Sequence, residues 1–413
     1  MSTSEAALLA LARDVGTDLD LDRHAPVSLD GVPVGVTLRP RGGDALARTL
    51  RALAERRLAV VPVGGARHLE LGNLPRRVDA LLSTDLLDGV DACERAEGVC
   101  HAGAGTRLGA LRARVAEAGW ELPLDAPDDA SVGGAIAAGA IGPRCAAFGA
   151  PRDVVLGLEV VLGSGERTHC GGRVVKNVTG YDLPKLYTGS CGSLCVIEGA
   201  WLRLRPRPQR TRVFRLPERR AADALARGIA ISRLDSVRVC ALRGAASAGL
   251  RGIVELAGAE ATVERDASLL ASDHGASDAG ADALDDAREP RRPAGAFAAC
   301  FRIPALPGQL AAVLAALGPG AAVLVHPGLR LVYAAFALAS ADDSAGAARA
   351  FDAAAAAARA AAGSFRCESA PPAAKRGRDV FGPAGDELAL VRALKSRFDP
   401  HGVLSPGRFA GCV

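Results

Sequence analysis

The residues best suited to chemistry lie in glycine-rich loops of the first half of the chain, each next to an apolar segment. The longest stretch runs from residue 172 to 199 and holds two lysines and five glycines before it enters an apolar run. Glycine weakens a strand interior, and it serves where backbone turns sharply or approaches another group closely. Two further loops of this kind span residues 62–73 and 131–144. Several such loops together indicate one extended ligand lying along backbone amides, which can hold phosphate.

The glycine spacing disfavours the two common nucleotide-binding motifs. The stretch GGARHLELG is not G-x-G-x-x-G, and no G-x-x-x-x-G-K-[ST] occurs anywhere in the chain. A nicotinamide-binding Rossmann domain and a P-loop nucleotidase are therefore both disfavoured.

The segments that must position these loops alternate between helical and extended patterns. Residues 44–57 carry leucines at helical spacing and are followed by the short apolar strand LAVVP, and residues 106–119 repeat the helical pattern. Residues 153–172 read as a strand, a Gly-Ser-Gly turn and a second strand. Residues 131–144 are too glycine-rich for a strand and too small in side chain for a core helix. Pro206 and Pro208 mark a domain boundary.

Composition excludes several classes of function. The 413 residues are 49% apolar and 23% charged, with a net charge of +4, which gives no argument for nucleic acid binding. The ten cysteines form no C-x-x-C pair, so neither a zinc site nor an iron–sulfur cluster is expected. The N-terminus reads as an amphipathic helix, not a signal peptide. We expect a cytoplasmic protein that partners can hold at the periphery of the inner membrane.

Three segments carry a resemblance to a known family. PVGGARHLELGN, LPLDAPDDASVGGAIAAGAIGPRCAAFGAPRDVVLG and VVKNVTGYDLPKLYTGSCGSLCVIEG resemble the PCMH-type FAD-binding domain of the vanillyl-alcohol oxidase superfamily. Within it, the chain is most similar to the FAD-binding E subunits of bacterial glycolate oxidases. The resemblance covers roughly residues 38–208 in order and the tail segment FDPHGVLSPGR, and it is faint between residues 208 and 380.

The resemblance implies an α+β fold and a division into domains. A helical extension would span residues 1–34, and a PCMH-type FAD-binding domain of two subdomains would span residues 35–208. A smaller α+β domain, similar to the C-terminal domain of FAD-linked oxidases, would span residues 209–413. The tail of that domain would return to the FAD-binding domain.

The resemblance also implies which residues contact FAD. They are Val63, Gly64, Gly65, Ala66, Arg67, His68, Ser131, Gly133, Gly134, Gly139, Gly142, Arg144, Gly149, Arg152, Asp153, Lys176, Asn177, Gly192 and Val196. Residues 63–68 would wrap the pyrophosphate, and residues 131–134 would continue that contact. Residues 139–144 would lie along the cofactor, and residues 149–153 would shape the turn below the flavin.

The remaining FAD contacts would lie at the two ends of the cofactor. Gly192 and Val196 would lie near the adenine and ribose. Lys176 and Asn177 would face the isoalloxazine or hold the loop that does. No catalytic residue is assigned.

The first loop departs from the family pattern in an informative way. Relatives commonly have Gly-Gly-Gly-Thr or a flavin-linking Gly-Gly-His, whereas this chain has Ala66 at the third position. We therefore expect non-covalent FAD, with His68 as the less favoured alternative attachment point. Alanine allows close approach of a ligand if its φ stays negative. Arg67 would add a phosphate contact or point to solvent.

The metal site of the related 2-hydroxyacid dehydrogenases is lost from the second domain. Their motif His-x-Gly-Asp-Gly-Asn-x-His corresponds to HPGLRLVY at residues 326–333. His326 and Gly328 remain, but Leu329, Arg330, Leu331 and Tyr333 replace the other positions. One histidine cannot supply the three or more ligands that a divalent metal needs, so we assign no metal.

Three functions remain open from the sequence. The first is an accessory FAD-binding subunit of a glycolate oxidase-type complex, beside a catalytic flavoprotein and an iron–sulfur subunit, with a small 2-hydroxy acid as substrate of the complex. The second is a free-standing FAD-dependent 2-hydroxyacid dehydrogenase, and the third is a scaffold that has lost FAD. The retained glycine loops argue against the scaffold. The lost metal motif favours the accessory subunit, which alone would oxidise glycolate or lactate slowly or not at all.

Overall fold

The computed structural model describes residues 3–94, 96–173, 181–288, 297–383 and 385–413. Its contacts divide the chain into two compact units. The first unit comprises residues 1–141, 149–207 and 383–413, and the second comprises residues 142–148 and 208–382. The short segment 142–148 thus lies within the first stretch of sequence but packs as part of the second unit.

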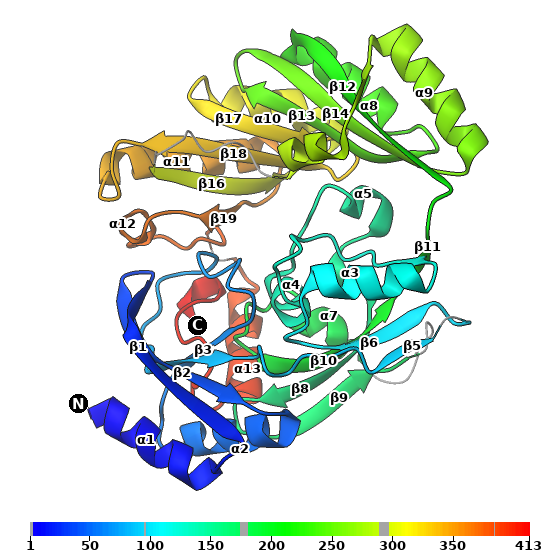
Figure 1. The fold of residues 1–413 in the computed structure, drawn as a ribbon. Coiled ribbons are helices and arrows are strands. Elements are labelled where there is room, and N and C mark those ends of the chain that lie inside the picture. The colour runs from blue at the N-terminus through cyan, green and yellow to red at the C-terminus, as the bar shows by residue number, and fades with distance from the viewer. Residues whose placement is uncertain (1–2, 95, 174–180, 289–296, 384) are drawn as a thin grey trace. The chain divides into compact units, whose positions relative to one another are not determined.

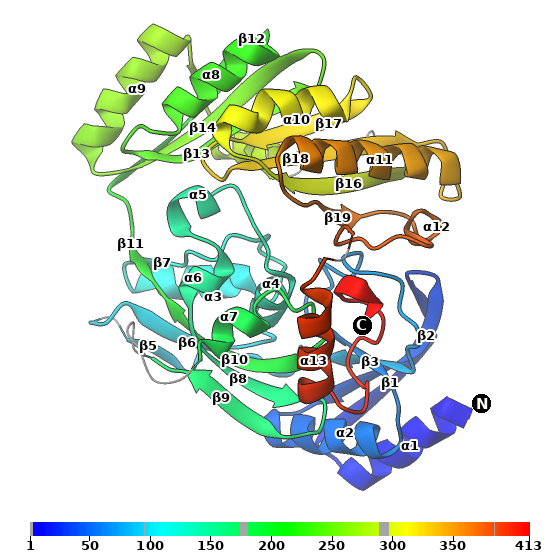
Figure 2. The ribbon, with the colours of Figure 1, turned by 180° about the vertical axis from the view of Figure 1, so that it is seen from behind.

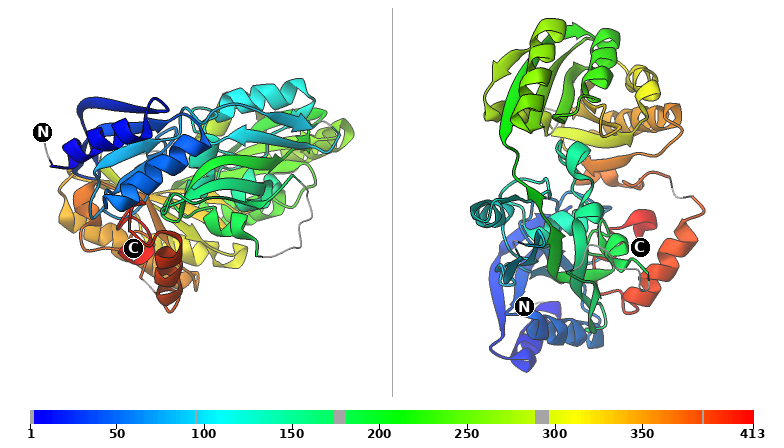
Figure 3. Two further views of the ribbon diagram at one scale, coloured as in Figure 1. Left: turned by 90° about the horizontal axis from the view of Figure 1, so that it is seen from below. Right: turned by 90° about the vertical axis from the view of Figure 1, so that its right-hand side faces the viewer.

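The first unit begins with a four-stranded sheet of order β1-β2-β4-β3 (Figure 1). Its strands are β1 (Leu19–Leu29), β2 (Val32–Pro40), β3 (Val60–Val63) and β4 (Ala80–Ser83). β2, β4 and β3 are parallel, whereas β1 pairs antiparallel with β2. The helices α1 (Thr3–Val15) and α2 (Gly43–Glu55) lie side by side and share one hydrophobic core with this sheet (Figure 3).

The interpretation of residues 1–34 as a helical extension is wrong beyond the first helix. After α1, the chain forms β1, which pairs with β2 along its length. The sequence LDLDRHAPVSL did not reveal this strand because apolar and polar residues alternate only over its first four positions, and exposed residues follow them. Only the end residues Leu19 and Leu29 are buried.

The second sheet of the first unit is antiparallel, of order β5-β6-β10-β8-β9. Its strands are β5 (Ala92–Glu94), β6 (Val99–Gly103), β8 (Val155–Leu162), β9 (Arg167–Gly171) and β10 (Cys195–Arg203). The helices of this part are α3 (Leu108–Glu117), α4 (Val132–Ala138), α6 (Pro151–Val154) and α7 (Leu183–Tyr187). The short strands β7 (Trp120–Glu121) and β11 (Arg205–Pro206) pair beside them.

The helix α4 corrects the expectation that residues 131–144 contain no helix. Ser131 caps its N-terminus, and Gly139 ends it in the left-handed conformation with φ 58°. The small side chains allow α4 to lie close to the residues after β6, since a Cβ on Gly133 would stand 2.7 Å from the Cβ of Ala104. The glycines therefore mark a closely packed helix.

The C-terminal segment, residues 383–413, belongs to the first unit. The helix α13 (Leu388–Phe398) and the residues after it lie beside β3 (Figure 2). Val60 forms a parallel bridge with Leu404. Lys395 fixes the segment by donating from Nζ to the carbonyl oxygens of Ser193 and Leu404, at 2.8 and 2.6 Å, and to Asp399 at 2.7 Å.

The second unit is built on one eight-stranded sheet of order β15-β12-β14-β13-β17-β18-β16-β19 (Figure 1). All of its pairings are antiparallel. The strands are β12 (Arg210–Arg220), β13 (Val237–Ala245), β14 (Gly249–Gly258), β15 (Ser277–Ala279), β16 (Phe297–Pro304), β17 (Ala321–His326), β18 (Leu331–Leu338) and β19 (Arg366–Ser369).

One face of this sheet is covered by four helices. They are α8 (Ala221–Ile231), α9 (Glu260–His274), α10 (Leu310–Leu317) and α11 (Ser344–Ala360), and their apolar residues form two cores with the strands. The opposite face packs against the 3-10 helix η1 (Ala281–Ala287).

The other short elements of the second unit are α5 (Cys145–Phe148), α12 (Pro372–Lys375) and the 3-10 turn η2 (Pro307–Gln309). In the first unit, the 3-10 turn η3 (Ala410–Cys412) ends the described elements. In the described residues, no helix is long and apolar enough to cross a bilayer.

Candidate functional site

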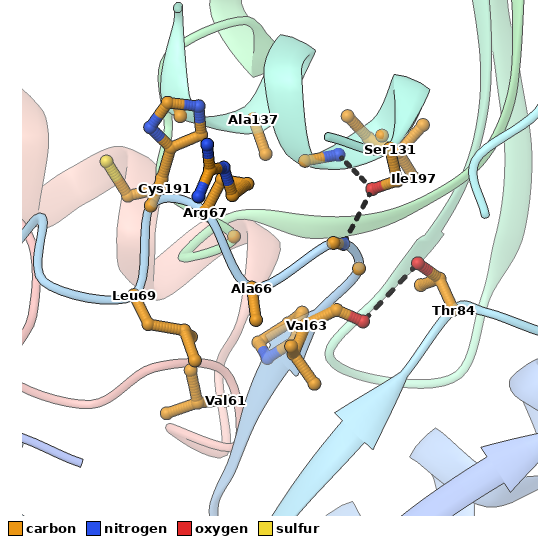
Figure 4. A pocket seen from close by; sticks show the side chains of 18 of the residues that line it. Val61, Val63, Ala66, Arg67, Leu69, Thr84, Ser131, Ala137, Cys191 and Ile197 are labelled. Atoms are coloured by element: carbon orange, nitrogen blue, oxygen red, sulfur yellow. Dashed lines mark hydrogen bonds between the residues drawn. The ribbon is translucent and has the colours of Figure 1, made fainter. Parts of the chain in front are cut away.

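A pocket in the first unit is formed by the loop after β3, the start of α4 and the loop before β10 (Figure 4). The loop after β3 crosses the pocket in front of α4, and Ser131 points from the start of that helix toward the loop. These segments come from separate parts of the sequence. The fold therefore brings the glycine-rich loops to one place.

Ser131 ties the loop to the helix. Its Oγ accepts hydrogen bonds from the backbone N–H of Gly65 and of Gly134, each at 3.2 Å (Figure 4). Thr84 Oγ1 donates to the Val63 carbonyl oxygen at 3.4 Å on the other side of the loop. One buried hydroxyl thus caps α4 and fixes the position of the loop at the same time.

The two glycines of the loop are required by this close packing. A Cβ on Gly64 would lie 2.0 Å from Ser131 Oγ, and a Cβ on Gly65 would lie 2.6 Å from the carbonyl oxygen of Asp129. Any side chain at these positions would push the loop away from residues 129–131. The glycines therefore create the cradle by letting two backbone segments touch.

Ala66 adopts a conformation that the sequence interpretation did not anticipate. Its φ is 59°, in the left-handed region that glycine enters freely and that costs alanine about 1 kcal/mol. The condition that φ stay negative is therefore not met. The family pattern with glycine at this position is explained by this backbone conformation.

Charges beside the loop are paired. Arg67 Nε lies 3.0 Å from Asp129 Oδ1, with both side chains at least half exposed. Arg107 Nη1 donates to the Asp129 carbonyl oxygen at 2.6 Å. Arg67 thus lines the pocket, and Asp129 holds its guanidinium group.

Arg408, in the C-terminal tail, is a site residue that sequence analysis missed. Its buried side chain donates from Nη2 to the carbonyl oxygens of Leu69 and Leu71, at 2.5 and 2.7 Å, and pairs with Asp30 at 2.7 Å. It holds the end of the pocket loop from the far end of the chain. The tail motif SPGR was visible in the sequence, but its target in space was not.

The loop before β10 closes the pocket from the other side. Gly192 has φ 65°, and a Cβ there would lie 3.2 Å from the ring of Pro62. Ser405 Oγ donates to the Gly192 carbonyl oxygen at 3.2 Å. Burial raises the pKa of the Cys195 thiol well above its usual value, which makes this lining cysteine a packing residue.

The structure brings most of the predicted FAD contacts together. The predicted residues that line this pocket are Val63, Gly64, Gly65, Ala66, Arg67, His68, Ser131, Gly133, Gly134, Gly192 and Val196. Further lining residues not predicted include Thr84, Ala137, Cys191, Ile197 and Arg408. The apolar ones gave no signal in the sequence, because they resemble ordinary core residues.

The other predicted contacts lie elsewhere. Gly139, Gly149, Arg152 and Asp153 are in the first unit but do not line this pocket. Asp153 accepts a hydrogen bond from the Ala150 amide at 2.9 Å, so it fixes the turn that begins α6. Lys176 and Asn177 fall outside the described residues.

Gly142 and Arg144 belong to the second unit. Arg144 Nε and Nη2 donate to the two carboxylate oxygens of Glu255 at 2.8 and 2.7 Å. This clamp fixes the segment 142–148 to β14. For both residues, an FAD contact stays a prediction.

The former metal motif lies on β17 and β18 of the second unit. His326 is buried, and its ring meets the ring of Tyr333 edge to face with centroids 6.0 Å apart. Within the described ranges, no group of three or more His, Cys, Asp and Glu residues is placed to hold a metal ion.

The pocket has the features that a dinucleotide requires. The backbone N–H groups of Ala66 and Arg67 make no hydrogen bond within the described part of the chain, so they can donate to phosphate oxygens. Gly133 and Gly134, in the N-terminal turn of α4, line the same pocket. The apolar side chains of Val61, Ala137 and Ile197 line the remainder. These residues fit the pyrophosphate of FAD.

Comparison with known proteins agrees with this fit. Residues 34–171 match the family model described as FAD binding domain. The chain is 39% identical over 180 residues to mitochondrial D-2-hydroxyglutarate dehydrogenase of Bos taurus, which covers 43% of this chain and 33% of that protein. It is 34% identical over 193 residues to D-lactate dehydrogenase of Archaeoglobus fulgidus, and this match covers 46% of this chain and 43% of that protein.

A third relative is the glycolate oxidase subunit GlcE of Escherichia coli, 39% identical over 124 residues, which covers 29% of this chain and 35% of that protein. The expected sequence similarity to the glycolate oxidase E subunits is therefore only partly supported, because the two dehydrogenases match over a longer stretch of this chain. The chain spans a third to less than half of the length of these relatives.

Solved structures show the fold of the whole chain. Alkyldihydroxyacetonephosphate synthase superposes with a TM-score of 0.69 at 13% identity, over 97% of this chain and 84% of that chain. Chitooligosaccharide oxidase superposes with a TM-score of 0.64 at 14% identity, over 97% and 98%. The chain thus has the α+β, PCMH-type FAD-binding fold of the FAD-linked oxidases, and its residues 34–171 match an FAD binding domain.

Proposed function

We propose that this protein is an FAD-dependent 2-hydroxyacid dehydrogenase that works as a single chain, with FAD bound non-covalently. The observation that carries the proposal is the cradle in which Ser131 joins the loop of Gly64 and Gly65 to α4. The substrate class is supported by the similarity to proteins named D-2-hydroxyglutarate dehydrogenase and D-lactate dehydrogenase.

The described residues would bind and orient the cofactor. The amides of Ala66 and Arg67 would hold the pyrophosphate. Gly133 and Gly134 would let it come close to α4, whose first-turn amides already donate to other groups of the protein. Arg408 keeps the pocket loop in place through the carbonyl oxygens of Leu69 and Leu71. When bound, FAD would accept the hydride that leaves the hydroxyl-bearing carbon of the substrate.

The comparisons change the preference drawn from the sequence. The loss of the metal motif favoured an accessory subunit, but relatives that match over longer stretches than GlcE are named as dehydrogenases rather than as subunits. The accessory FAD-binding subunit becomes the second candidate. It is supported by the similarity to GlcE and by Leu329, Leu331 and Tyr333 in place of metal ligands.

Turnover by the purified chain separates the two candidates. The protein is supplied with D-2-hydroxyglutarate, D-lactate or glycolate and an artificial electron acceptor, and the L-enantiomers serve as controls. The single-chain proposal expects turnover of at least one D-acid without any other protein. Turnover only after a catalytic flavoprotein and an iron–sulfur subunit are added would establish the second candidate. Acid precipitation should release the flavin, and flavin that stays on the chain would refute non-covalent binding.

A further inference from the structure

One segment near the end of the chain, residues 395–409, contacts both loops of the FAD pocket, and we call it the strap. Arg408 ties the strap to the loop after β3, because its Nη2 atom donates to the carbonyl oxygens of Leu69 and Leu71 at 2.5 and 2.7 Å. The backbone adds a further hydrogen bond, from the amide of Asn73 to the Arg408 carbonyl oxygen at 2.9 Å. The strap therefore fixes the path of this loop.

The same strap also holds the loop before β10. Ser405 Oγ donates to the Gly192 carbonyl oxygen at 3.2 Å, and Lys395 Nζ donates to the Ser193 carbonyl oxygen at 2.8 Å. Gly192 lines the FAD pocket, as do Leu69 and Leu71 of the other loop. The strap thus sets the positions of two pocket walls that lie far apart in the sequence.

Lys395 is the residue that fastens the strap to the loop before β10. An ammonium group has three N–H donors, and each finds an acceptor here: the carbonyl oxygens of Ser193 and Leu404, the latter at 2.6 Å, and Asp399 Oδ2 at 2.7 Å. Asp399 in turn accepts from the amides of Val403 and Leu404, each at 2.9 Å. The Lys395 side chain is 12% exposed and that of Asp399 is fully buried, so water is poorly placed to replace these bonds.

Lys395 does not itself line the FAD pocket, so any effect on the cofactor passes through the loop that it holds. The loop after β3 fits the pyrophosphate, and Gly192 is expected near the adenine. We infer that Lys395 is a positioning residue for FAD, which holds the loop before β10 at the place that the ADP half of the cofactor requires. The inference rests on FAD binding in this pocket, as the proposed function does, but not on which acid is oxidised.

This role makes the strap and the cofactor interdependent. Both hold the same two loops, so an intact strap should strengthen FAD binding, and bound FAD should stabilise the strap to the same extent. A lysine that only stabilised the fold would show neither effect in the folded protein.

Calorimetry with the FAD-free protein tests the inference, with FAD and ADP as ligands. Lys395→Met should weaken the binding of both about 10- to 100-fold and by a similar factor, because charge-assisted hydrogen bonds that hold the loop are lost. Ser405→Ala removes one neutral hydrogen bond to the same loop and should weaken both about 2- to 10-fold. Ser405→Ala decides the question if Lys395→Met does not fold.

Lys185→Met is the matched control. Lys185 pairs with Asp182 at 2.8 Å, with both side chains 55% exposed, and it does not line the pocket. Its loss should leave the affinities for FAD and ADP unchanged. FAD weakened without ADP in the strap variants would place the effect at the flavin end and overturn the inference.

Hydrogen exchange of the strap measures the reciprocal effect. The amides of Val403 and Leu404 donate to Asp399, and that of Ser405 donates to the Val60 carbonyl oxygen at 2.8 Å. Their exchange should slow when FAD is loaded into the parent, and should slow less in Lys395→Met. Equal exchange with and without FAD, or unchanged affinities in folded strap variants, would overturn the inference even in an active dehydrogenase. Weakened FAD binding in the variants of a parent that oxidises no acid would support the inference and refute the proposed dehydrogenase.

Discussion

Arg144 donates from Nε and Nη2 to both carboxylate oxygens of Glu255, whose side chain is fully buried. This pair joins the segment 142–148 to the sheet of the second unit, and Phe148 of the same segment lies 5.1 Å beneath the guanidinium of Arg238. We therefore interpret Arg144 as a residue that fixes the segment 142–148 on the sheet of the second unit.

The first prediction concerns this pair. Arg144→Met should lower the free energy of unfolding of the second unit by about 3–5 kcal/mol, because it leaves the Glu255 carboxylate buried without its main partner. Chemical denaturation followed by circular dichroism measures the loss. The double variant Arg144→Met/Glu255→Met should recover most of it, since no buried charge remains. Equal stability of the single variant and the parent would show that the pair contributes little.

The second prediction concerns the cofactor cradle. Gly134→Asp should abolish FAD binding while the protein stays folded, because a Cβ there meets only Ser131 Oγ, at 2.9 Å, and the added carboxylate would face the pyrophosphate. Bringing a second unpaired negative charge into such a site costs several kcal/mol by order of magnitude. Gly65→Asp should also lose FAD, but with damage to the loop, since its Cβ would meet backbone at 2.6 Å.

The flavin content of the purified variants is the measurement. Ala66→Gly is the matched control, because glycine accepts φ 59° more readily than alanine, and FAD binding should be preserved or improved. Full flavin content in Gly134→Asp would place the pyrophosphate elsewhere.

The third prediction concerns the dependence of stability on pH. Burial tends to raise the pKa of Asp266, but hydrogen bonds from the hydroxyl and amide of Ser236 and from Arg265 outweigh it and lower that pKa. Since the folded pKa lies below the unfolded value of about 3.9, the ionised group stabilises the fold above that pH. The contribution is lost as the pH falls through the folded pKa.

Asp266→Asn should therefore be less stable than the parent near neutral pH, and the difference should shrink in acid below about pH 4. Urea denaturation across that range gives the comparison. Asp352→Asn, at an exposed position of α11, should show no such trend. A constant difference at all pH values would mean that Asp266 stabilises the fold by packing alone.

Much of the fold could be predicted because the apolar periodicity of the segments agrees with their final structure. The helix expected at residues 44–57 is α2, and the strand–turn–strand at 153–172 contains β8 and β9. The strand β1 was missed because its alternation of apolar and polar residues stops after four positions, and α4 was missed because its small residues pack by close approach rather than by bulk.

The parts of the candidate site that depend on local backbone conformation could be predicted from the sequence. The parts that depend on contacts with residues far away in the sequence could not. The loop of Gly64 and Gly65 could be predicted from its glycine-rich composition. Arg408 approaches this loop only through the folded tail, and Arg144 is directed to Glu255 by a segment that packs with the other unit. The left-handed φ of Ala66 also follows from packing that no local pattern reveals.

The most direct test of the proposed function is single-turnover reduction of the flavin. The purified, FAD-loaded chain is mixed rapidly and without oxygen with D-2-hydroxyglutarate, D-lactate and glycolate, with the L-enantiomers as controls, and the visible flavin absorbance is followed. We predict that at least one D-acid bleaches the flavin rapidly, at a rate that saturates with acid concentration. A flavin that dithionite reduces but that none of the acids bleaches would contradict the proposal.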